Sequence, residues 1–373
     1  MQLRPRHMGV LLAMAAALVA TIAAGCGDSG NAANGSNGSS LTGGQSLSGE
    51  IAGAGSSAQQ AAQEAWIAAF QQQNPGVTIA YDPVGSGGGR EAFIAGGKTV
   101  FAGSDSALAD EELSGAQARC GGPDNLVEIP DYISPIAVAY NVSSVDSLKL
   151  SPDTLAKIFR GDVKKWNDPL IAQENSGVDL PDTDITVVHR SDESGTTDNF
   201  TDYLSKAAPK DWTSEVSGNW PIKGGEAAEG TSGVVDAIKN GDGSIGYADE
   251  SQVGELGKAE IKVGSEYVGP SADAAAKIFA DSKKSDDPGK NVFTYVLNRN
   301  TEASGTYPIV LVSYLMACTT YDKPSDAKIV RAYADYVISA DGQETANQAA
   351  GSAPLSDDVR EQIQPAVHAI GAA

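Results

Sequence analysis

Strand-like apolar runs, Gly/Ser turns and helix-period segments alternate along the first part of the chain. Three such units begin at residues 50–57, 77–89 and 99–105. After the first of them, the apolar residues that recur at helical spacing share one face: Ala62, Ala65, Trp66, Ala69 and Phe70. This repeated succession of strand and helix predicts a doubly wound α/β domain, in which ligands bind beyond the strand ends.

Two further apolar segments predict that the chain passes twice between two domains. Residues 125–140 carry apolar runs broken by Pro130 and Pro135, and residues 307–315 form a second long run. Because two crossing segments make a hinge, we expect two domains that can close on one another. The predicted boundaries are residues 48–133 and 307–373 for domain I and residues 134–306 for domain II.

The start of the chain has a pattern typical of export. Arg4 and Arg6 precede an apolar run and then small residues, which predicts a secretory signal peptide over residues 1–25 rather than a membrane span. The four residues from Ala23 to Cys26 resemble a bacterial lipobox, with alanine where leucine is usual, so that Cys26 is expected to carry lipid. We therefore expect an extracytoplasmic protein that is lipid-anchored to the outer face of the cell membrane.

Composition predicts a flexible tether followed by a strongly acidic protein. Residues 26–47 are mostly Gly, Ser and Asn and offer no core to bury. Removing residues 1–25, which hold two arginines and no acid, changes the formal charge from −22 to −24. That acidity argues against nucleic acid and against a basic membrane-binding surface. A small anion is still compatible, because exposed charges farther away than roughly 8 Å are largely screened and local donors decide.

The chain has only three cysteines, Cys26, Cys120 and Cys318. If Cys26 carries lipid, the other two lie in an oxidising compartment and are expected to form one disulfide. A metal site is the weaker alternative, because the two cysteines are isolated and no histidine stands at ligand spacing. We therefore expect neither a metal nor a cofactor.

The stretch from Thr186 to Tyr203 is the clearest candidate for a binding site. A β-branched run ends at Arg190, and four residues later Ser194-Gly195-Thr196 opens a segment with helical periodicity. That order places a fixed positive charge beside a helix N-terminus, where free N–H groups, hydroxyls and the helix dipole favour a small anion. The alternative is an ordinary capped helix with Arg190 paired to Asp192.

Other hydroxyl-bearing helix starts occur at Ser56/Ser57, Ser86 and Ser104. Singly, each is more often an N-cap than a ligand, but together with one arginine and one carboxylate they indicate a site. The glycine-rich segments lack the full dinucleotide and P-loop patterns, and no Gly-x-Ser-x-Gly motif is present. The pattern therefore favours binding of an anion over nucleotide binding or serine catalysis.

Several segments of the chain carry a resemblance to a known family: residues 53–57, 84–88, 101–105, 158–168, 190–196, 243–247 and 307–309. In these segments, and over nearly all of the chain after the tether, it resembles the extracytoplasmic phosphate-binding proteins of the PstS type, which serve phosphate ABC transporters. This resemblance implies a type II periplasmic-binding-protein fold with an interdomain cleft and a two-strand hinge. It also implies a monomeric protein that takes up inorganic phosphate and delivers it to membrane permease subunits.

The resemblance further implies which residues contact phosphate: Ser57, the amide of Ala58, Ser86, Asp105, Arg190, Ser194, Gly195 and Thr196. Asp192 matches the acid that holds the arginine. Ser57 stands where the family often has threonine, and Ala58 where an aromatic residue is common.

The chemistry of phosphate agrees with a lone carboxylate at this position. Phosphate at neutral pH keeps a P–O–H group, for which Asp105 would be the acceptor, whereas sulfate has no proton to offer. A site built around a required hydrogen bond can reject the analogue lacking it by roughly 10⁴- to 10⁵-fold. Two alternatives remain: a binding protein for sulfate or molybdate, and a secreted phosphatase with Ser57 or Ser194 as nucleophile. The missing catalytic base and metal cluster argue against the phosphatase.

Overall fold

The computed structural model describes residues 46–286 and 289–372. The predicted signal peptide, the lipobox with Cys26 and most of the predicted tether lie outside these residues. From Ser46 onward the chain forms one compact unit.

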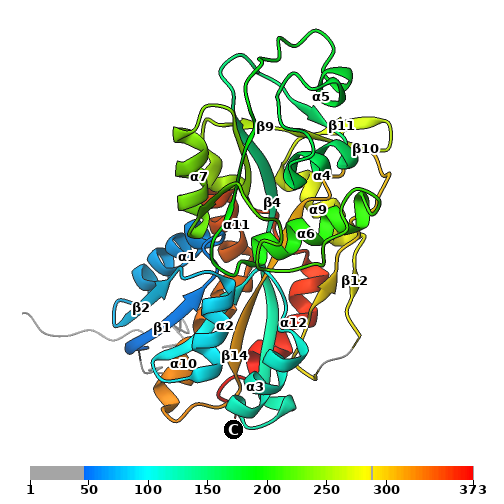
Figure 1. Cartoon of the computed structure of the whole chain (residues 1–373). Helices are drawn as coiled ribbons and strands as arrows, with labels where there is room; N and C mark the ends of the chain where they lie inside the picture. The colour runs from blue at the N-terminus through cyan, green and yellow to red at the C-terminus, as the bar shows by residue number, and fades with distance from the viewer. Residues whose placement is uncertain (1–45, 287–288, 373) are drawn as a thin grey trace, which may run out of the picture. The chain divides into compact units, whose positions relative to one another are not determined.

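The main sheet has nine strands, of which eight follow the order β2-β1-β3-β14-β4-β8-β6-β7 and β9 pairs with β4. Figure 1 labels β1, β2, β4, β9 and β14 of this sheet. The strands are β1 (Gly49–Gly55), β2 (Val77–Asp82), β3 (Thr99–Ser104), β4 (Leu126–Asn141), β5 (Lys149–Leu150), β6 (Thr186–Arg190), β7 (Glu226–Ala228), β8 (Ser244–Asp249), β9 (Gly257–Lys258), β10 (Glu260–Val263), β11 (Glu266–Val268), β12 (Lys283–Lys284), β13 (Tyr295–Val296) and β14 (Val310–Cys318). Strands β5, β10 and β11 form a small second sheet, and β12 pairs with β13.

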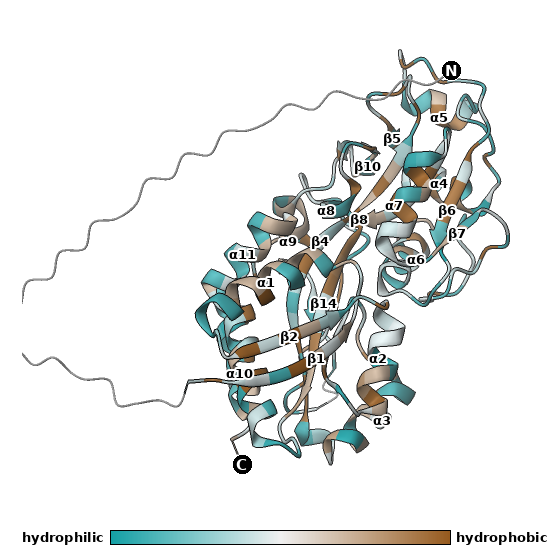
Figure 2. Cartoon of the chain, turned by 90° about the vertical axis from the view of Figure 1, so that its left-hand side faces the viewer, coloured by the Kyte–Doolittle hydropathy of each residue, from teal (hydrophilic) through white to brown (hydrophobic). Residues whose placement is uncertain are grey.

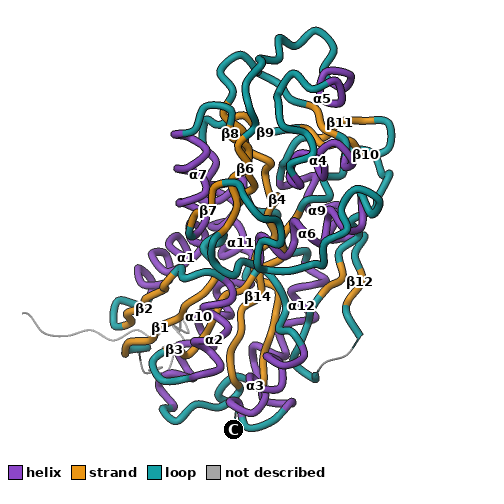
Figure 3. The backbone as a smooth tube through the Cα atoms, in the orientation of Figure 1, coloured by secondary structure: helices purple, strands orange, loops and turns teal. Residues whose placement is uncertain are grey.

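Helices lie on both sides of the main sheet (Figure 3). They are α1 (Gln60–Gln73), α2 (Ser86–Ala95), α3 (Asp110–Cys120), α4 (Pro152–Arg160), α5 (Pro169–Glu174), α6 (Gly195–Ala207), α7 (Gly230–Asn240), α8 (Glu250–Val253), α9 (Ala272–Ala280), α10 (Pro324–Ile338), α11 (Ala340–Ala350) and α12 (Asp357–Ala369), with a 3₁₀ turn at Pro123–Asn125. The three predicted strand–helix units are present as β1–α1, β2–α2 and β3–α3, so that the α/β fold class is confirmed.

Strand β4 joins two halves of the main sheet. Its residues from Leu126 to Pro135 pair with β14, and those from Ile136 to Asn141 pair with β8. We call β2, β1, β3, β14 and the start of β4 the first half, and the end of β4 with β8, β6 and β7 the second half. The change of partner lies close to the predicted domain boundary at residue 133.

The apolar run that predicted a crossing segment is buried over nearly its whole length, from Leu126 to Tyr140. Strand β4 pairs first with β14 and then with β8, and its apolar side chains belong to two buried hydrophobic clusters. Figure 2 shows helices beside the sheet along this strand. Near one end of this region, Cys120 at the end of α3 is bonded to Cys318 at the end of β14. This bond makes no link to the second half of the sheet. It therefore does not restrict the point at which β4 changes its partner strand.

In the second half, an aromatic cluster holds the start of α6 against the sheet. The ring centroid of Phe200 on α6 lies 4.5 Å from that of Tyr247 on β8 and 4.8 Å from that of Phe159 on α4. The hydroxyl of Tyr247 lies 2.7 Å from that of Thr197 in the first turn of α6. The helix N-terminus is thereby fixed on a rigid strand. In the described part of the chain, no helix is long and apolar enough to cross a bilayer.

Candidate functional site

The turn after β3 and the starts of α2 and α6 meet at Asp105. The Thr196 hydroxyl donates to Asp105 Oδ2 over 3.2 Å, and the Ser86 hydroxyl lies 3.5 Å from the same oxygen. Gly195 permits this approach, because a Cβ at that position would lie 2.8 Å from Ser86 Oγ and from Asp105 Cβ. Two helix N-termini, one from each half of the sheet, therefore converge on one carboxylate oxygen.

Asp105 is 2% exposed, and its other oxygen is bound inside the protein, where Oδ1 accepts the Ser313 hydroxyl over 2.7 Å. The Asn199 amide donates to the backbone carbonyl of Asp105 over 2.6 Å and fixes the turn. Burial raises the pKa of Asp105 above its usual range, against the lowering effect of nearby hydroxyls and of the Arg190 charge. The carboxyl group is thus oriented by Ser313 and Asn199, with Oδ2 directed at the site.

Arg190 is buried and forms a bidentate ion pair with Asp192. Its Nε donates to Asp192 Oδ1 over 2.8 Å, and Nη2 pairs with Oδ2. The backbone N–H of Gly230 also donates to Asp192 Oδ1, over 3.1 Å. Burial raises the pKa of Asp192, but the hydrogen bonds and charge of Arg190 outweigh this and leave it below the usual value. Asp192 therefore stays ionised and orients the guanidinium, and Nη1 has no acceptor among the described residues.

Ser57 contacts the second half through the start of α7. Its Oγ accepts the N–H of Thr231 over 3.1 Å and lies 3.1 Å from the Thr231 hydroxyl. The side-chain amide of Gln252 donates to the carbonyls of Ser57 and Ala58, over 2.8 and 3.0 Å. Since Gly230, next to Thr231, binds Asp192, the start of α7 links Ser57 to the Arg190–Asp192 pair.

Two more of the predicted contacts are engaged within the protein. The N–H of Ala58 donates to Ser56 Oγ over 3.0 Å, so that an anion would have to share or replace this bond. Ser194 Oγ accepts the N–H of Thr197 over 3.3 Å and caps α6, as the alternative of an ordinary capped helix predicts. A hydroxyl that accepts a hydrogen bond still has its own proton to donate, so the cap does not prevent Ser194 from binding a ligand.

The structure also brings in residues that the sequence reasoning missed: Arg90, Glu193, Asn199, Thr231, Gln252 and Ser313. Thr231 could have been found, because Gly230-Thr231 is another hydroxyl-bearing helix start. The position of Ser313 inside an apolar strand gave no signal, because its role depends on pairing between distant strands.

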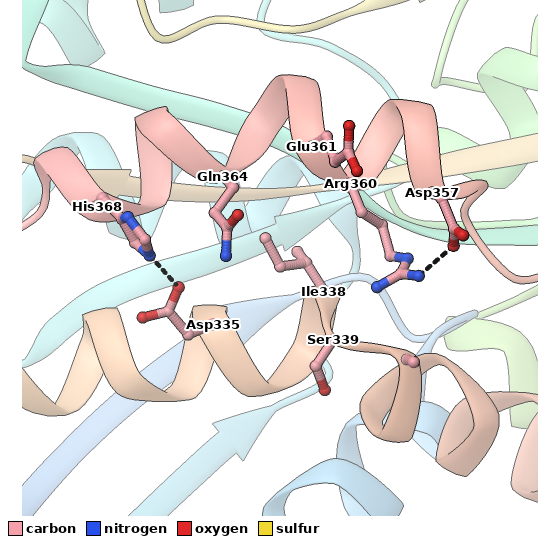
Figure 4. A pocket seen from close by; sticks show the side chains of 9 residues that line it. Asp335, Ile338, Ser339, Asp357, Arg360, Glu361, Gln364 and His368 are labelled. Atoms are coloured by element: carbon pink, nitrogen blue, oxygen red, sulfur yellow. Dashed lines mark hydrogen bonds and ion pairs between the residues drawn. The ribbon is translucent and has the colours of Figure 1, made fainter.

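A cavity of about 540 Å³ between α10 and α12 lies apart from these residues (Figure 4). Its arginine is already paired with an acid, Arg360 with Asp357, and His368 Nε2 lies 3.3 Å from Asp335 Oδ1. Glu361 adds a further negative charge, and none of the predicted site residues lines the cavity. This cavity is therefore a poor place for an anion.

Comparison with known proteins places the chain in a family. Residues 40–341 match the PBP superfamily domain. Phosphate-binding protein PstS 3 of Mycobacterium leprae (strain TN) is 35% identical over 85% of this chain and 85% of its own length. PstS 3 of Mycobacterium tuberculosis (strain ATCC 25618 / H37Rv) is 37% identical over the same shares. The chain belongs to the PBP superfamily and, within it, to the PstS family of phosphate-binding proteins, which confirms the resemblance seen in its sequence.

Solved structures agree with this assignment at the level of the fold. A high-affinity periplasmic phosphate-binding protein, PfluDING, bound with phosphate, superposes with a TM-score of 0.68 at 23% identity, over 85% of this chain and 93% of that one. A putative phosphate ABC transporter substrate-binding protein with bound phosphate, from Clostridium perfringens, gives 0.59 at 16% identity, over 83% and 100%. The predicted binding-protein fold is thereby confirmed.

Proposed function

We propose that this protein captures inorganic phosphate between the two halves of its sheet and delivers it to a membrane ABC permease. The relatives named above are phosphate-binding proteins, and one structural neighbour is described as an ABC transporter substrate-binding protein. The observation that carries the proposal is the arrangement at Asp105: a buried carboxylate oxygen beside two hydroxyls and a helix N-terminus, with the Arg190 charge close enough to oppose the rise that burial causes in its pKa.

This arrangement suits an anion that still has a proton. The helix N-terminus at Gly195 and Thr196, the hydroxyls and Arg190 supply donors for the phosphate oxygens. Asp105 Oδ2 supplies the acceptor that P–O–H needs. The pair can hold one shared proton, either on phosphate or on Asp105, whereas sulfate facing an ionised Asp105 would bring two acceptors together without a proton.

Within this proposal the contacts are those that the sequence predicted: Ser57, Ala58, Ser86, Asp105, Arg190, Ser194, Gly195 and Thr196, supported by Asp192. The two halves of the sheet act as domains I and II, and β4 with the segment before β14 acts as the hinge. All six contact side chains other than that of Ala58 are less than 5% exposed, which supports assigning the structure to a closed form. Phosphate would enter only after the halves separate.

We further propose that the ligand leaves unchanged and that the protein is not an enzyme. Ser57 is bound to Thr231 and Ser194 to the N–H of Thr197, and neither hydroxyl contacts a histidine or carboxylate among the described residues. Protein free of contaminating phosphatases should release no product from a chromogenic phosphate ester. The proposed form is a monomer outside the cell membrane, anchored by lipid at Cys26.

Isothermal titration tests the central proposal. Protein starting at Ser46 and freed of bound anion should bind one phosphate per chain and show no heat with sulfate or molybdate at the same pH. Binding of another anion without binding of phosphate would contradict the proposal. Labelling of cells with a radioactive fatty acid tests the anchor, because Cys26→Ala should lose the label while the parent chain keeps it.

A further inference from the structure

Arg90 is a buried cation that the anion site does not use. It lies on α2, four residues after Ser86, and is 4% exposed. Its Nη1 donates to the hydroxyls of Ser104 and Ser106, over 2.9 and 3.1 Å. These two serines flank Asp105 on either side, so the Arg90 guanidinium holds the turn that presents Asp105.

Two carboxylates neutralise Arg90, and they come from different halves of the molecule. Nε donates to Glu112 on α3 over 2.9 Å, within the first half. Nη2 pairs with Glu193 over 2.5 Å, and Glu193 directly precedes Ser194 in the second half. With four of its five N–H groups directed at protein acceptors, Arg90 is equipped to position its neighbours rather than to bind the anion.

The backbone of α2 leaves space for the Glu193 side chain to reach Arg90 from the other half. A Cβ on Gly87 would lie 2.6 to 2.7 Å from the Glu193 side chain, so this position in α2 has room only for glycine. The N–H of Gly87 also points at the carbonyl of Glu193, 3.4 Å away. The starts of α2 and α6 therefore meet in two ways. Both contact Asp105, and Glu193, just before α6, contacts Gly87 and Arg90 of α2.

We propose that Arg90 and Glu193 are a positioning pair that joins the two halves in the closed form and slows the loss of bound phosphate. This inference rests on the proposed function for its ligand. When the halves close, Glu193 completes the partners of Arg90, and Arg90 in turn fixes the Asp105 turn through Ser104 and Ser106. When they open, Arg90 keeps Glu112 and loses its second acid.

The chain offers a matched control, because Glu112 and Glu193 bind the same guanidinium and only Glu193 does so across the two halves. Glu193→Gln should release phosphate about tenfold faster, since losing one partner of a close charge pair acts mainly on dissociation. The 38% exposure of the Glu193 side chain keeps this effect below that of a fully buried pair. Glu112→Gln should change the release rate less than about twofold, because its pair persists in both forms. Neither variant should alter the preference for phosphate over sulfate.

Release is measured by loading radiolabelled phosphate, diluting rapidly into unlabelled phosphate and following the bound label. A second measurement needs no ligand: in small-angle X-ray scattering, ligand-free Glu193→Gln should have a larger radius of gyration than the parent, and Glu112→Gln should match the parent. Glu193→Asp, which keeps the charge, should recover part of the slow release.

Equal release rates and equal radii for parent and Glu193→Gln would overturn the inference, as would equal effects of both Gln variants. If the parent binds no phosphate, the proposed function fails, and the scattering comparison alone decides whether Glu193 joins the halves.

Discussion

Asp105→Asn is the most informative single change, because it keeps the shape of the side chain and removes its charge. Oδ1 of Asp105 accepts from Ser313 over 2.7 Å, which the amide oxygen of asparagine can still do. The NH₂ group would then replace Oδ2, at 3.2 Å from the Thr196 hydroxyl and 3.5 Å from that of Ser86. The variant therefore turns the acceptor of the site into a donor.

The size of the effect follows from the bond that is lost. A hydrogen bond to a charged group contributes about 1.5–3 kcal/mol, which corresponds to phosphate binding weaker by roughly 10- to 150-fold. Sulfate should gain, because the new donor can bind an oxygen that the carboxylate repelled. If the parent prefers phosphate over sulfate by roughly 10⁴- to 10⁵-fold, this preference should fall by at least about 10-fold.

Titration calorimetry with phosphate and sulfate at one pH measures both affinities. Asp131→Asn is the matched control: Asp131 is fully buried, neither of its carboxylate oxygens has a hydrogen-bond partner among the described residues, and burial raises its pKa well above the usual value. Asp131 makes no side-chain hydrogen bond to a site residue, so its variant should keep the parent ratio. An unchanged ratio in Asp105→Asn, or an equal fall in both variants, would refute the role given to Asp105.

Three further predictions follow from the contacts described. Arg190→Lys should weaken phosphate binding by about 10- to 100-fold in titration, because the single ammonium of lysine cannot replace a planar guanidinium that two bonds to Asp192 orient. Binding within twofold of the parent would contradict this. Burial raises the pKa of Glu128 and of Asp249 to about 7, so the folded chain binds more protons than the unfolded chain between about pH 4 and 7. The calorimetric melting temperature should therefore be higher at pH 5 than at pH 7.5, and the opposite slope would show that these acids are ionised when folded. Mass spectrometry after alkylation of unreduced protein should find Cys120 and Cys318 unmodified, and two modified thiols would disprove the bridge.

Much of the fold could be predicted because local patterns and the native structure agree. The strand–helix units of the first half, the long buried β4 and the arginine before the start of α6 all appear where the apolar periodicity and the turn residues placed them.

The candidate site was predicted less completely. Ser86, Asp105, Arg190 and Thr196 were singled out as hydroxyls, an acid and a base at helix starts, and the structure brings them together. The residues that support them gave no local signal. Ser313, Asn199 and Arg90 act through neighbours 14 to 208 positions away, and a one-dimensional pattern does not contain such pairings.

The sequence by itself determined the class of the protein, the order of its strands and helices along the chain, and the residue types that can meet an anion, because propensity, periodicity and capping act over a few residues. Only the tertiary structure decided which oxygen of Asp105 is directed at the site, that Thr231 and Gln252 reach Ser57 from the other half, and that Glu193 completes the partners of Arg90. Those arrangements depend on how β4 exchanges one partner strand for another, and that exchange sets the distance between helix starts that lie far apart in the chain.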